Sequence, residues 1–502
     1  MLQKKLITLS KTNYLLYREC KNNTWLKIHK PDIYYEFEPN EFEKLIMKTG
    51  NEVELVARKL FPQGILIDVK GDQAVTLTSK YIKEKKPVIF QATFTKDGFF
   101  AAVDILEFDS KSGSYSIYEV KSTNSIDEKT HYYDLAFQVS LLKKLGLKIK
   151  KINLIHLNKD YILSGDLNIK ELFKTEDITE IIESLVDQVG IEMTEALDYL
   201  SQELQPVGNC DCLYKGRSKH CTCFSILNPD IPKYGIHDIS RIGLSKKKLA
   251  ELVDGAYFNI DQIPPHIKLS TIQQNQIDTY VSDKTILNKE LLAMELKSLI
   301  FPLYFIDYET FPSAIPRFKG FSPYQHIIFQ YSLYVLDSPD SKPTLLEFLY
   351  TDLDDPTLYF GESLKTHIKD KGHIIVWHKD FECGRNEEVS IRLPKMKSFI
   401  DSFNLRIFDL ETIFKKQYYV HKNFKGSTSI KKVLQVLVPD LTYNDVDIKD
   451  GGGAAESWNR LHTEKMSKEE KEKIKTNLKK YCGLDAYAMY AIWKELYKFI
   501  NS

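Results

Sequence analysis

A chain of 502 residues, 43% apolar and 27% charged, has an ordinary globular composition, and its length predicts two to four domains. Its 69 basic residues equal its 69 acidic ones, so no overall basicity indicates nucleic-acid binding, although a neutral total can hide a basic groove. Residues 1–7 are followed by polar residues rather than by a long apolar run, and no apolar run in the chain approaches roughly 18 residues. This pattern predicts a soluble, cytoplasmic protein without a membrane span.

The first predicted domain, residues 1–225, has a mixed α/β order. Its helical segments are expected at 12–28, 40–60 and 133–145, and its strands at 99–108, 114–121 and 149–157. The first two strands are joined by Ser110-Lys111-Ser112-Gly113, which predicts a β-hairpin.

The predicted hairpin brings acidic and basic residues together. If the four-residue loop closes it, Asp109 pairs with Ser114, and the register carries Asp104 opposite Glu119. Side chains in such pairs lie about 5 Å apart at Cβ, so two carboxylates can share one cation. Because side chains alternate between faces, Lys121 lies on the same face as Glu119.

This set of residues suits phosphodiester cleavage. A divalent cation supplies an acidic water and charge neutralisation, and two or three carboxylates suffice to hold Mg²⁺. A lysine beside them can orient or deprotonate the attacking water and stabilise developing charge. The alternative is an exposed strand pair with incidental charges, but facing acids repel unless something holds them.

Thiols cluster near the end of this domain, as Cys210, Cys212, Cys221 and Cys223, four of the seven cysteines. In a cytosolic chain, clustered thiols indicate metal ligation more than disulfides, with chance clustering as the alternative. Cys383 and Cys482 stand alone and are expected in the core.

The middle segment, residues 226–297, is expected to be a helical linker punctuated by prolines. Within it, residues 239–249 place an apolar-Gly-apolar turn before a lysine-rich helix start. This pattern resembles a helix-hairpin-helix element, whose turn offers backbone N–H groups to phosphate; a solvated linker helix is the alternative.

The third predicted unit, residues 298–502, opens with an apolar strand that ends in carboxylates. Asp307 and Glu309 are two apart on this strand and therefore share a face. Further strands are expected at 327–335, 344–350 and 373–377, and a closing helix at 467–500. On that helix Tyr481 and Asp485 are four apart and share a face. Together these residues predict a three-carboxylate pocket with a phenol at its edge, where two cations about 4 Å apart can sit.

Asp104 followed by Glu119-Val120-Lys121 resembles the PD-(D/E)XK nuclease motif in its RecB-like form. The resemblance implies that Glu54 is an additional metal ligand, since such enzymes often carry a His or Glu at this place. It also implies that Gln138, on the helix after the motif, binds substrate; the tyrosine that usually follows this glutamine is Leu142 here.

The cysteines are similar to those of a RecB-like subgroup that includes AddB-type nucleases and certain CRISPR-associated exonucleases. These proteins join one cysteine before the nuclease core to three after it through a [4Fe-4S] cluster. The resemblance implies five candidates for four positions: Cys20, Cys210, Cys212, Cys221 and Cys223. Such a cluster would be structural, locking the two ends of the domain and contributing folding free energy. A structural zinc site made of the four downstream cysteines is the alternative.

The third unit resembles the DEDDy exonuclease family, on the ribonuclease H-like fold, through its Asp-x-Glu strand and Tyr-x-x-x-Asp helix. The family's second motif, typically Asn-x-x-x-Phe-Asp, aligns with residues 377–382. The alignment implies that Glu382 is the fourth carboxylate, with His378 near the usual Asn; Asp380 and Asp409 are alternatives for this carboxylate. Tyr481 is implied to orient the nucleophilic water.

Taken whole, the chain resembles an uncharacterised bacterial family that fuses a RecB-like nuclease domain to a DEDDy-like exonuclease domain. The expected fold is mixed α/β: a restriction-endonuclease-like α/β/α domain and a ribonuclease H-like α/β domain joined by a helical segment. The implied activity is that of a metal-dependent exonuclease that hydrolyses nucleic acid, with DNA favoured over RNA and with Mg²⁺ or Mn²⁺ at both acidic sites. The implied role is in repair, recombination or defence. The alternatives are a non-catalytic nucleic-acid-binding scaffold and an iron-sulfur redox sensor; no membrane partner is expected.

Overall fold

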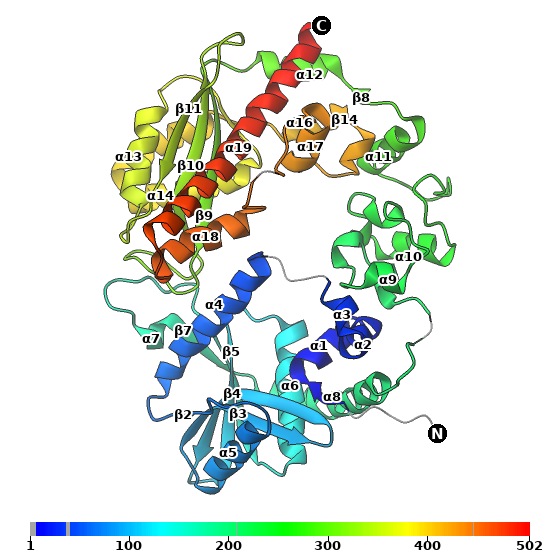
Figure 1. Cartoon of the computed structure of the whole chain (residues 1–502), viewed down its shortest axis with the longest axis vertical. Coiled ribbons are helices and arrows are strands. Elements are labelled where there is room, and N and C mark those ends of the chain that lie inside the picture. Colours follow the sequence, from blue (N-terminus) through cyan, green and yellow to red (C-terminus); the bar gives the residue numbers. More distant parts are fainter. Residues whose placement is uncertain (1–6, 37–40, 207, 445) are drawn as a thin grey trace. The chain divides into compact units, whose positions relative to one another are not determined.

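The computed structural model describes residues 7–36, 41–206, 208–444 and 446–502. Over these residues the chain is mixed α/β, as predicted, and forms two compact units (Figure 1). Unit 1 comprises residues 1–231 and 314–324, and unit 2 comprises residues 232–313 and 325–502. By its contacts, nearly all of the segment expected as a linker therefore belongs to unit 2. None of the helices in the described ranges combines the length and apolar character needed to cross a bilayer.

Unit 1 is built on a seven-stranded sheet in which the path β2-β3-β4-β5-β6-β7 is extended by β1, which pairs with β4. The strands are β1 (Leu9–Ser10), β2 (Ile65–Leu66), β3 (Val88–Lys96), β4 (Phe99–Asp109), β5 (Ser114–Lys121), β6 (Ile149–Leu157) and β7 (Phe173–Asp177). Antiparallel pairing joins β3, β4 and β5, whereas β5 and β6 are parallel. The three strands predicted for this part of the chain are confirmed.

The register of the β4–β5 hairpin is the predicted one. Asp109 pairs with Ser114, and the ladder continues to Ile105 opposite Tyr118, the last pair before Asp104 and Glu119. Ile105 is buried in a cluster with residues of α4 (Glu41–Ala57). Since side chains alternate along a strand, Asp104 lies on the other face of the sheet, the face covered by α6 (Glu128–Lys144).

The remaining helices of unit 1 pack on this sheet or on the helices beside it. They are α1 (Lys11–Glu19), α2 (Lys21–His29), α3 (Pro31–Tyr34), α5 (Gly71–Lys83), α7 (Ile169–Leu172), α8 (Thr179–Leu200) and α9 (Phe224–Leu227), with 3₁₀ turns at Arg58–Leu60, Asp211–Tyr214 and Arg217–Lys219. Helix α6 is buried without a break from Asp134 to Leu142 because it packs between the sheet and α8.

The loop of residues 314–324, which is distant in sequence from the rest of unit 1, completes the core of that unit. Ala314 and Ile315 are buried in the same cluster as Ile105. The N–H of Leu163 donates to the carbonyl of Phe321 at 3.0 Å, and the N–H of Gly320 donates to the carbonyl of Leu163 at 2.7 Å. This loop joins two strands of unit 2 in sequence, yet its contacts make it part of unit 1.

Unit 2 is built on a five-stranded sheet with the order β11-β10-β9-β12-β13. Its strands are β9 (Leu303–Pro312), β10 (His326–Leu336), β11 (Thr344–Leu349), β12 (Ile374–Val376) and β13 (Ile407–Asp409), and a separate pair is formed by β8 (Ile286–Leu287) and β14 (Tyr419–Val420). The first three strands in this order are antiparallel, and β9, β12 and β13 are parallel. The strands predicted for this unit are confirmed.

The helices of unit 2 include those that cover both faces of this sheet. They are α10 (Lys246–Asp254), α11 (Thr271–Ser282), α12 (Lys289–Lys297), α13 (Thr357–His367), α14 (Lys379–Arg392), α15 (Lys397–Leu405), α16 (Thr412–Lys415), α17 (Ile430–Leu437), α18 (Gly451–Thr463) and α19 (Lys468–Asn501), with 3₁₀ turns at Ile236–Asp238, Ile242–Leu244, Pro394–Met396 and Lys422–Phe424. The long closing helix α19, drawn in red in Figure 1, runs along the sheet. Leu303 and Phe305 pack in its cluster, whereas Tyr304 and Ile306 pack against the α13–α15 side. Asp307 continues the first series and therefore faces α19.

The apolar-Gly-apolar turn of the middle segment forms the 3₁₀ turn at Ile242–Leu244, and α10 begins directly after it. The element before the turn is a three-residue 3₁₀ helix, Ile236–Asp238, rather than an α-helix. The two-helix arrangement of a helix-hairpin-helix element is therefore incomplete at this place.

Candidate functional site

The hairpin site lies on unit 1 where the pairing of β4 with β5 ends, and the structure brings Asp104, Glu119 and Lys121 together there. The backbone N–H of Val120 donates to Oδ2 of Asp104 at 2.8 Å, and Nζ of Lys121 lies 2.8 Å from Oε1 of Glu119. Both carboxylates are buried, Glu119 with 2% of its surface exposed. The three residues of the predicted motif thus form one group.

Two further residues of this site were not predicted. Nζ of Lys11 lies 2.8 Å from Oε1 of Glu119, and Nζ of Lys121 lies 2.5 Å from Oδ2 of Asp134. Asp134 is four residues before Gln138 on α6, so its spacing could have indicated a shared face. Lys11, far from the hairpin in sequence, offered no local signal.

Gln138 lies behind the acids and is fully buried. Its Nε2 donates to Oε2 of Glu119 at 2.8 Å and to Oδ1 of Asp134 at 3.0 Å. In this arrangement the glutamine orients the two carboxylates and does not face solvent.

Glu54, the additional ligand implied by resemblance, lies at the rim of the hairpin site. Its Oε1 accepts from Nε2 of Gln91 and from the guanidinium of Arg58, each at 2.6 Å. The same Gln91 nitrogen lies 3.2 Å from Oδ1 of Asp104, so it bridges the two acids. Gln91 has a φ of 55°, which non-glycine residues rarely adopt.

The pKa values of Asp104 and Glu119 are shifted in opposite directions. Burial and the charge of Glu119 raise the pKa of Asp104 to about 7, although Lys11 opposes this shift. Burial acts in the same direction on Glu119, but Lys11 and Lys121 overcome it and hold the pKa of Glu119 well below its usual value. Glu119 is therefore ionised at neutral pH, while Asp104 titrates there.

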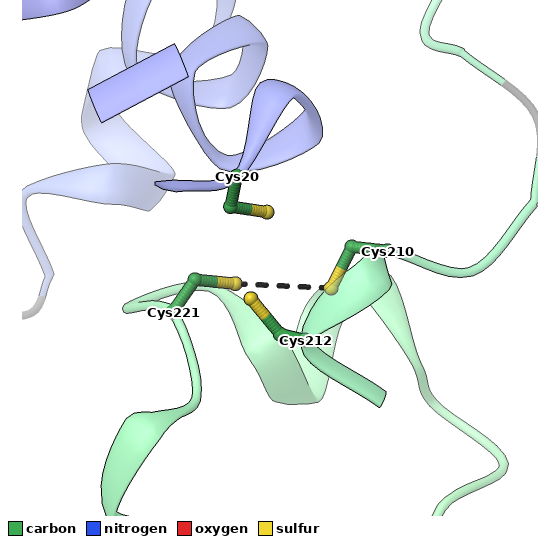
Figure 2. Close-up of side chains that lie close together, drawn as sticks. All are labelled: Cys20, Cys210, Cys212 and Cys221. Carbon is green, nitrogen blue, oxygen red and sulfur yellow. Dashed lines mark hydrogen bonds between the residues drawn. The ribbon is translucent and has the colours of Figure 1, made fainter. Parts of the chain in front are cut away.

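A second group on unit 1 consists of thiols. Figure 2 shows four cysteine side chains pointing toward one another: Cys20, Cys210, Cys212 and Cys221. Their Sγ atoms all lie within 4.8 Å of one another, and those of Cys210 and Cys221 are 3.9 Å apart. Cys20 comes from the junction of α1 and α2, so the group joins the two ends of unit 1.

The arrangement of the thiols fits a metal. A tetrahedral ion with bonds of about 2.3 Å separates its sulfurs by about 3.8 Å, close to the spacing of Cys210 and Cys221. Nδ2 of Asn228 donates to Sγ of Cys210 at 3.3 Å, and Nζ of Lys215 donates to Sγ of Cys212 at 3.7 Å. Such donors favour the thiolate form that ligates metals.

Cys223, the fifth candidate, lies outside this group. It is buried, its N–H donates to Oδ1 of Asn23 at 3.0 Å, and burial raises the pKa of its thiol to about 11. The alternative zinc site, made of the four downstream cysteines, is therefore not the group that the structure forms. Cys20 belongs to the group and Cys223 does not.

The second acidic site lies on unit 2 between β9 and α19. Oxygens of Asp307 and Glu309 lie within 4.8 Å of each other and of Sγ of Cys482. The Cys482 thiol donates to the backbone carbonyl of Asp307 at 3.5 Å. Cys482 was expected in the core; it is buried, and it also borders the acids.

Helix α19 supplies the third carboxylate and the phenol. Asp485 accepts a hydrogen bond of 2.5 Å from the hydroxyl of Tyr443. Burial raises the pKa of Asp485, and the hydrogen bonds from Tyr443 and Tyr481 oppose this shift. Nζ of Lys431 lies 5.0 Å from the ring centre of Tyr443 and 5.7 Å from that of Tyr481. Tyr443 and Lys431 were not predicted, since both come from segments without a motif.

Glu382 on α14 belongs to the same electrostatic group. Burial raises the pKa of Asp307 well above its usual value, and Asp485, Glu309 and Glu382 raise it further. Glu382 is 2% exposed, and its Oε2 has no hydrogen-bond partner among the residues that the structure describes. Burial, followed by the charge of Asp409, raises the pKa of Glu382 to about 8. A buried acid with an unpaired oxygen suits a cation ligand.

The local alternatives to Glu382 have other surroundings. Asp380 is exposed at the start of α14. Oδ1 of Asp409 accepts from the N–H groups of His378 at 3.1 Å and Glu411 at 3.0 Å, so that it holds the backbone between β12 and β13.

Comparison with known proteins gives two matches. Residues 304–429 match a domain of unknown function, DUF2779, and this segment contains Asp307, Glu309 and Glu382 but ends before α19. The uncharacterised protein MG366 of Mycoplasma genitalium is 27% identical over 210 residues, which cover 38% of this chain and 31% of that protein. The match thus spans about a third of the relative's length, and neither the name of the domain nor that of the relative states an activity.

Proposed function

We propose that the chain is a divalent-metal-dependent nuclease with one acidic site in each unit. The observation that carries this proposal is the gathering of carboxylates from distant elements of unit 2: the partly buried Asp307 and the buried Glu309, Glu382 and Asp485. Each of these like charges raises the pKa of Asp307, so the group favours a bound cation that would offset the repulsion.

The unit 2 site has the parts that phosphodiester hydrolysis needs. A divalent cation, when bound, supplies a more acidic water and neutralises phosphate charge. Tyr481 would orient the attacking water with its hydroxyl, and the Lys431 ammonium would favour a negatively charged substrate nearby. Three antiparallel strands followed by two parallel ones agree with the ribonuclease H-like architecture that the resemblance implies.

The hairpin site supports the same chemistry in unit 1. Asp104 and Glu119 would hold a cation, with Glu54 at the rim, because carboxylate oxygens are the ligands that Mg²⁺ and Mn²⁺ prefer. Lys121 would orient the attacking water and stabilise the developing charge. The thiols of Cys20, Cys210, Cys212 and Cys221 would hold zinc or an iron-sulfur cluster in a structural role.

The test is a digestion panel of labelled single- and double-stranded DNA and RNA with Mg²⁺ or Mn²⁺. The full chain is compared with Lys121→Met, Asp307→Asn and the double variant. We expect each single variant to lose one activity by about 100-fold or more, and the double variant to lose both. DNA is the expected substrate, with digestion from an end.

Asp380→Asn is the matched control, because this carboxylate is exposed on the same helix as Glu382. It should digest at the wild-type rate. Wild-type digestion by the double variant would contradict the proposal. Tight binding of nucleic acid without digestion by the wild type would favour the non-catalytic scaffold instead.

A further inference from the structure

We propose that Lys11 is a built-in counter-cation of the hairpin site, which competes with a divalent metal for Glu119 and so sets the metal concentration that the site requires. This inference rests on the proposed metal-dependent function of that site. It assigns Lys11 as a positioning residue, distinct from Lys121 of the nuclease-like motif.

The oxygens of Glu119 are already engaged. Oε1 accepts from Nζ of Lys11 and from Nζ of Lys121, both at 2.8 Å, and Oε2 accepts from Gln138 at 2.8 Å. A carboxylate oxygen has two lone-pair sites, so a metal that binds Oε1 must displace one of the ammonium groups. Lys121 also contacts Asp134 at 2.5 Å, whereas Lys11 is 3.7 Å from that residue. Lys11 is therefore the more weakly held of the two lysines.

The charges of the site make this competition direct. Lys11 and Lys121 both contact Glu119 and Asp134. The charges of Asp104, Glu119 and Asp134 all stabilise the ammonium of Lys11. Two positive charges thus offset most of the negative charge that would attract a metal. Removing Lys11 leaves a more negative pocket. At contact distance the Coulomb energy between one ammonium group and a metal ion exceeds the free energy that corresponds to a tenfold change in affinity.

Lys11 is fixed in place by its helix. Leu9 pairs with Phe99 of β4, and the side chain of Ser10 caps α1 by accepting from the N–H of Asn13 at 3.2 Å. Tyr14 donates to Glu192 of α8 at 2.7 Å, and α1 ends at Cys20 in the thiol group. Contacts at both ends of α1 therefore fix the position of Lys11 beside Glu119, whereas a lysine on an exposed surface rotates freely.

The test is Mn²⁺ binding to the full chain, measured by the free-Mn²⁺ signal in electron paramagnetic resonance and by calorimetry. Every protein carries Asp307→Asn and Glu309→Gln, so that only the hairpin site reports. On this background we compare no further change with Lys11→Met, Lys11→Arg, Glu119→Gln and Lys83→Met. Lys83, an exposed lysine at the end of α5, is the matched control. Circular dichroism verifies that each variant is folded.

We expect Lys11→Met to bind Mn²⁺ at least about tenfold more tightly, while Lys11→Arg and Lys83→Met bind like the background protein and Glu119→Gln binds at least tenfold more weakly. The Mg²⁺ concentration for half-maximal digestion should fall by the same factor in Lys11→Met. Unchanged or weaker binding by folded Lys11→Met, together with loss from Glu119→Gln, would overturn the role of Lys11 alone. Absence of Mn²⁺ binding in all five proteins would overturn the proposed metal site as well.

Discussion

Asp104 is the residue whose charge decides how the hairpin site behaves near neutral pH. Its pKa in the folded protein is about 7, raised from 3.8 by burial and by Glu119. The unfolded chain releases this proton near 3.8, whereas the folded protein keeps it until about pH 7. Because the folded state binds more protons in this window, the contribution of Asp104 to stability is lost as the pH rises from about 4 to 7.

We predict that Asp104→Asn stabilises the protein relative to wild type by an amount that grows with pH up to about 7 and then stays constant. Its upper limit is on the order of 4 kcal/mol, since each unit of pKa shift corresponds to about 1.4 kcal/mol. Denaturant unfolding between pH 5 and 8, in buffer without added divalent cations, measures the difference. Asp187→Asn, an exposed change on α8, should give a gap that does not vary with pH. A constant gap for Asp104→Asn would refute the assignment.

At the scale of elements, α1 connects the two groups of unit 1, since Lys11 begins it and Cys20 ends it. We predict that Cys20→Ser weakens metal binding at the thiols at least about tenfold, while Cys223→Ser keeps the wild-type metal content. Mass-spectrometric metal analysis of the purified proteins measures this. Equal loss from both serine variants would contradict the set of four. Zinc alone would indicate a single ion, and iron with acid-labile sulfide would indicate a cluster.

A metal at the thiols should also stabilise the C-terminal end of α1. When Cys20 loses its partners, the C-terminal end of α1 loses an attachment, and its amide hydrogens should exchange faster. Hydrogen exchange of Cys20→Ser should therefore show lost protection in α1 and α2, with α19 of unit 2 unchanged as an internal reference. Unchanged protection in α1 would mean that packing against α6 and α8 suffices to hold it.

At the scale of the whole molecule, the chain crosses between its compact units three times, and the loop at 314–324 belongs to unit 1. Phe321 in this loop is 1% exposed. We predict that Phe321→Ala costs about 3–5 kcal/mol, and that the loss appears in unit 1 although β9 and β10 of unit 2 flank the loop in sequence. Hydrogen exchange located by mass spectrometry should show faster exchange in unit 1 around Leu163, whose N–H donates to the carbonyl of Phe321.

Leu405→Ala is the control for that experiment, because Leu405 is 87% exposed and its truncation should leave both units unchanged. Faster exchange confined to β9 and β10 would contradict the assignment of the loop to unit 1. The loop also means that a fragment ending at residue 231 lacks part of the core of unit 1, so we expect such a fragment to be less stable than the intact chain.

Much of the fold was predictable because it follows from local patterns. The bounds of β5 and β6 match the predicted ranges, and the predicted pairing of Asp109 with Ser114 holds. The face shared by Asp307 and Glu309 likewise follows from the two-residue repeat of a strand. Strand alternation, turn length and helical spacing act between near neighbours, and the sequence contains all three.

The sequence by itself therefore determined the strands and helices that carry the motifs, the hairpin register and the faces on which the motif residues lie. It did not indicate β1, β2, β3 and β7, or the break at Cys20 between α1 and α2. Tertiary structure decided which distant residues join the motif residues: Lys11 and Asp134 at the hairpin, Tyr443 and Lys431 near Asp485, and Cys20 rather than Cys223 among the thiols. It also decided that the loop after β9 belongs to unit 1. These choices depend on how separate helices and strands pack, and packing between distant segments leaves no periodic trace in the sequence.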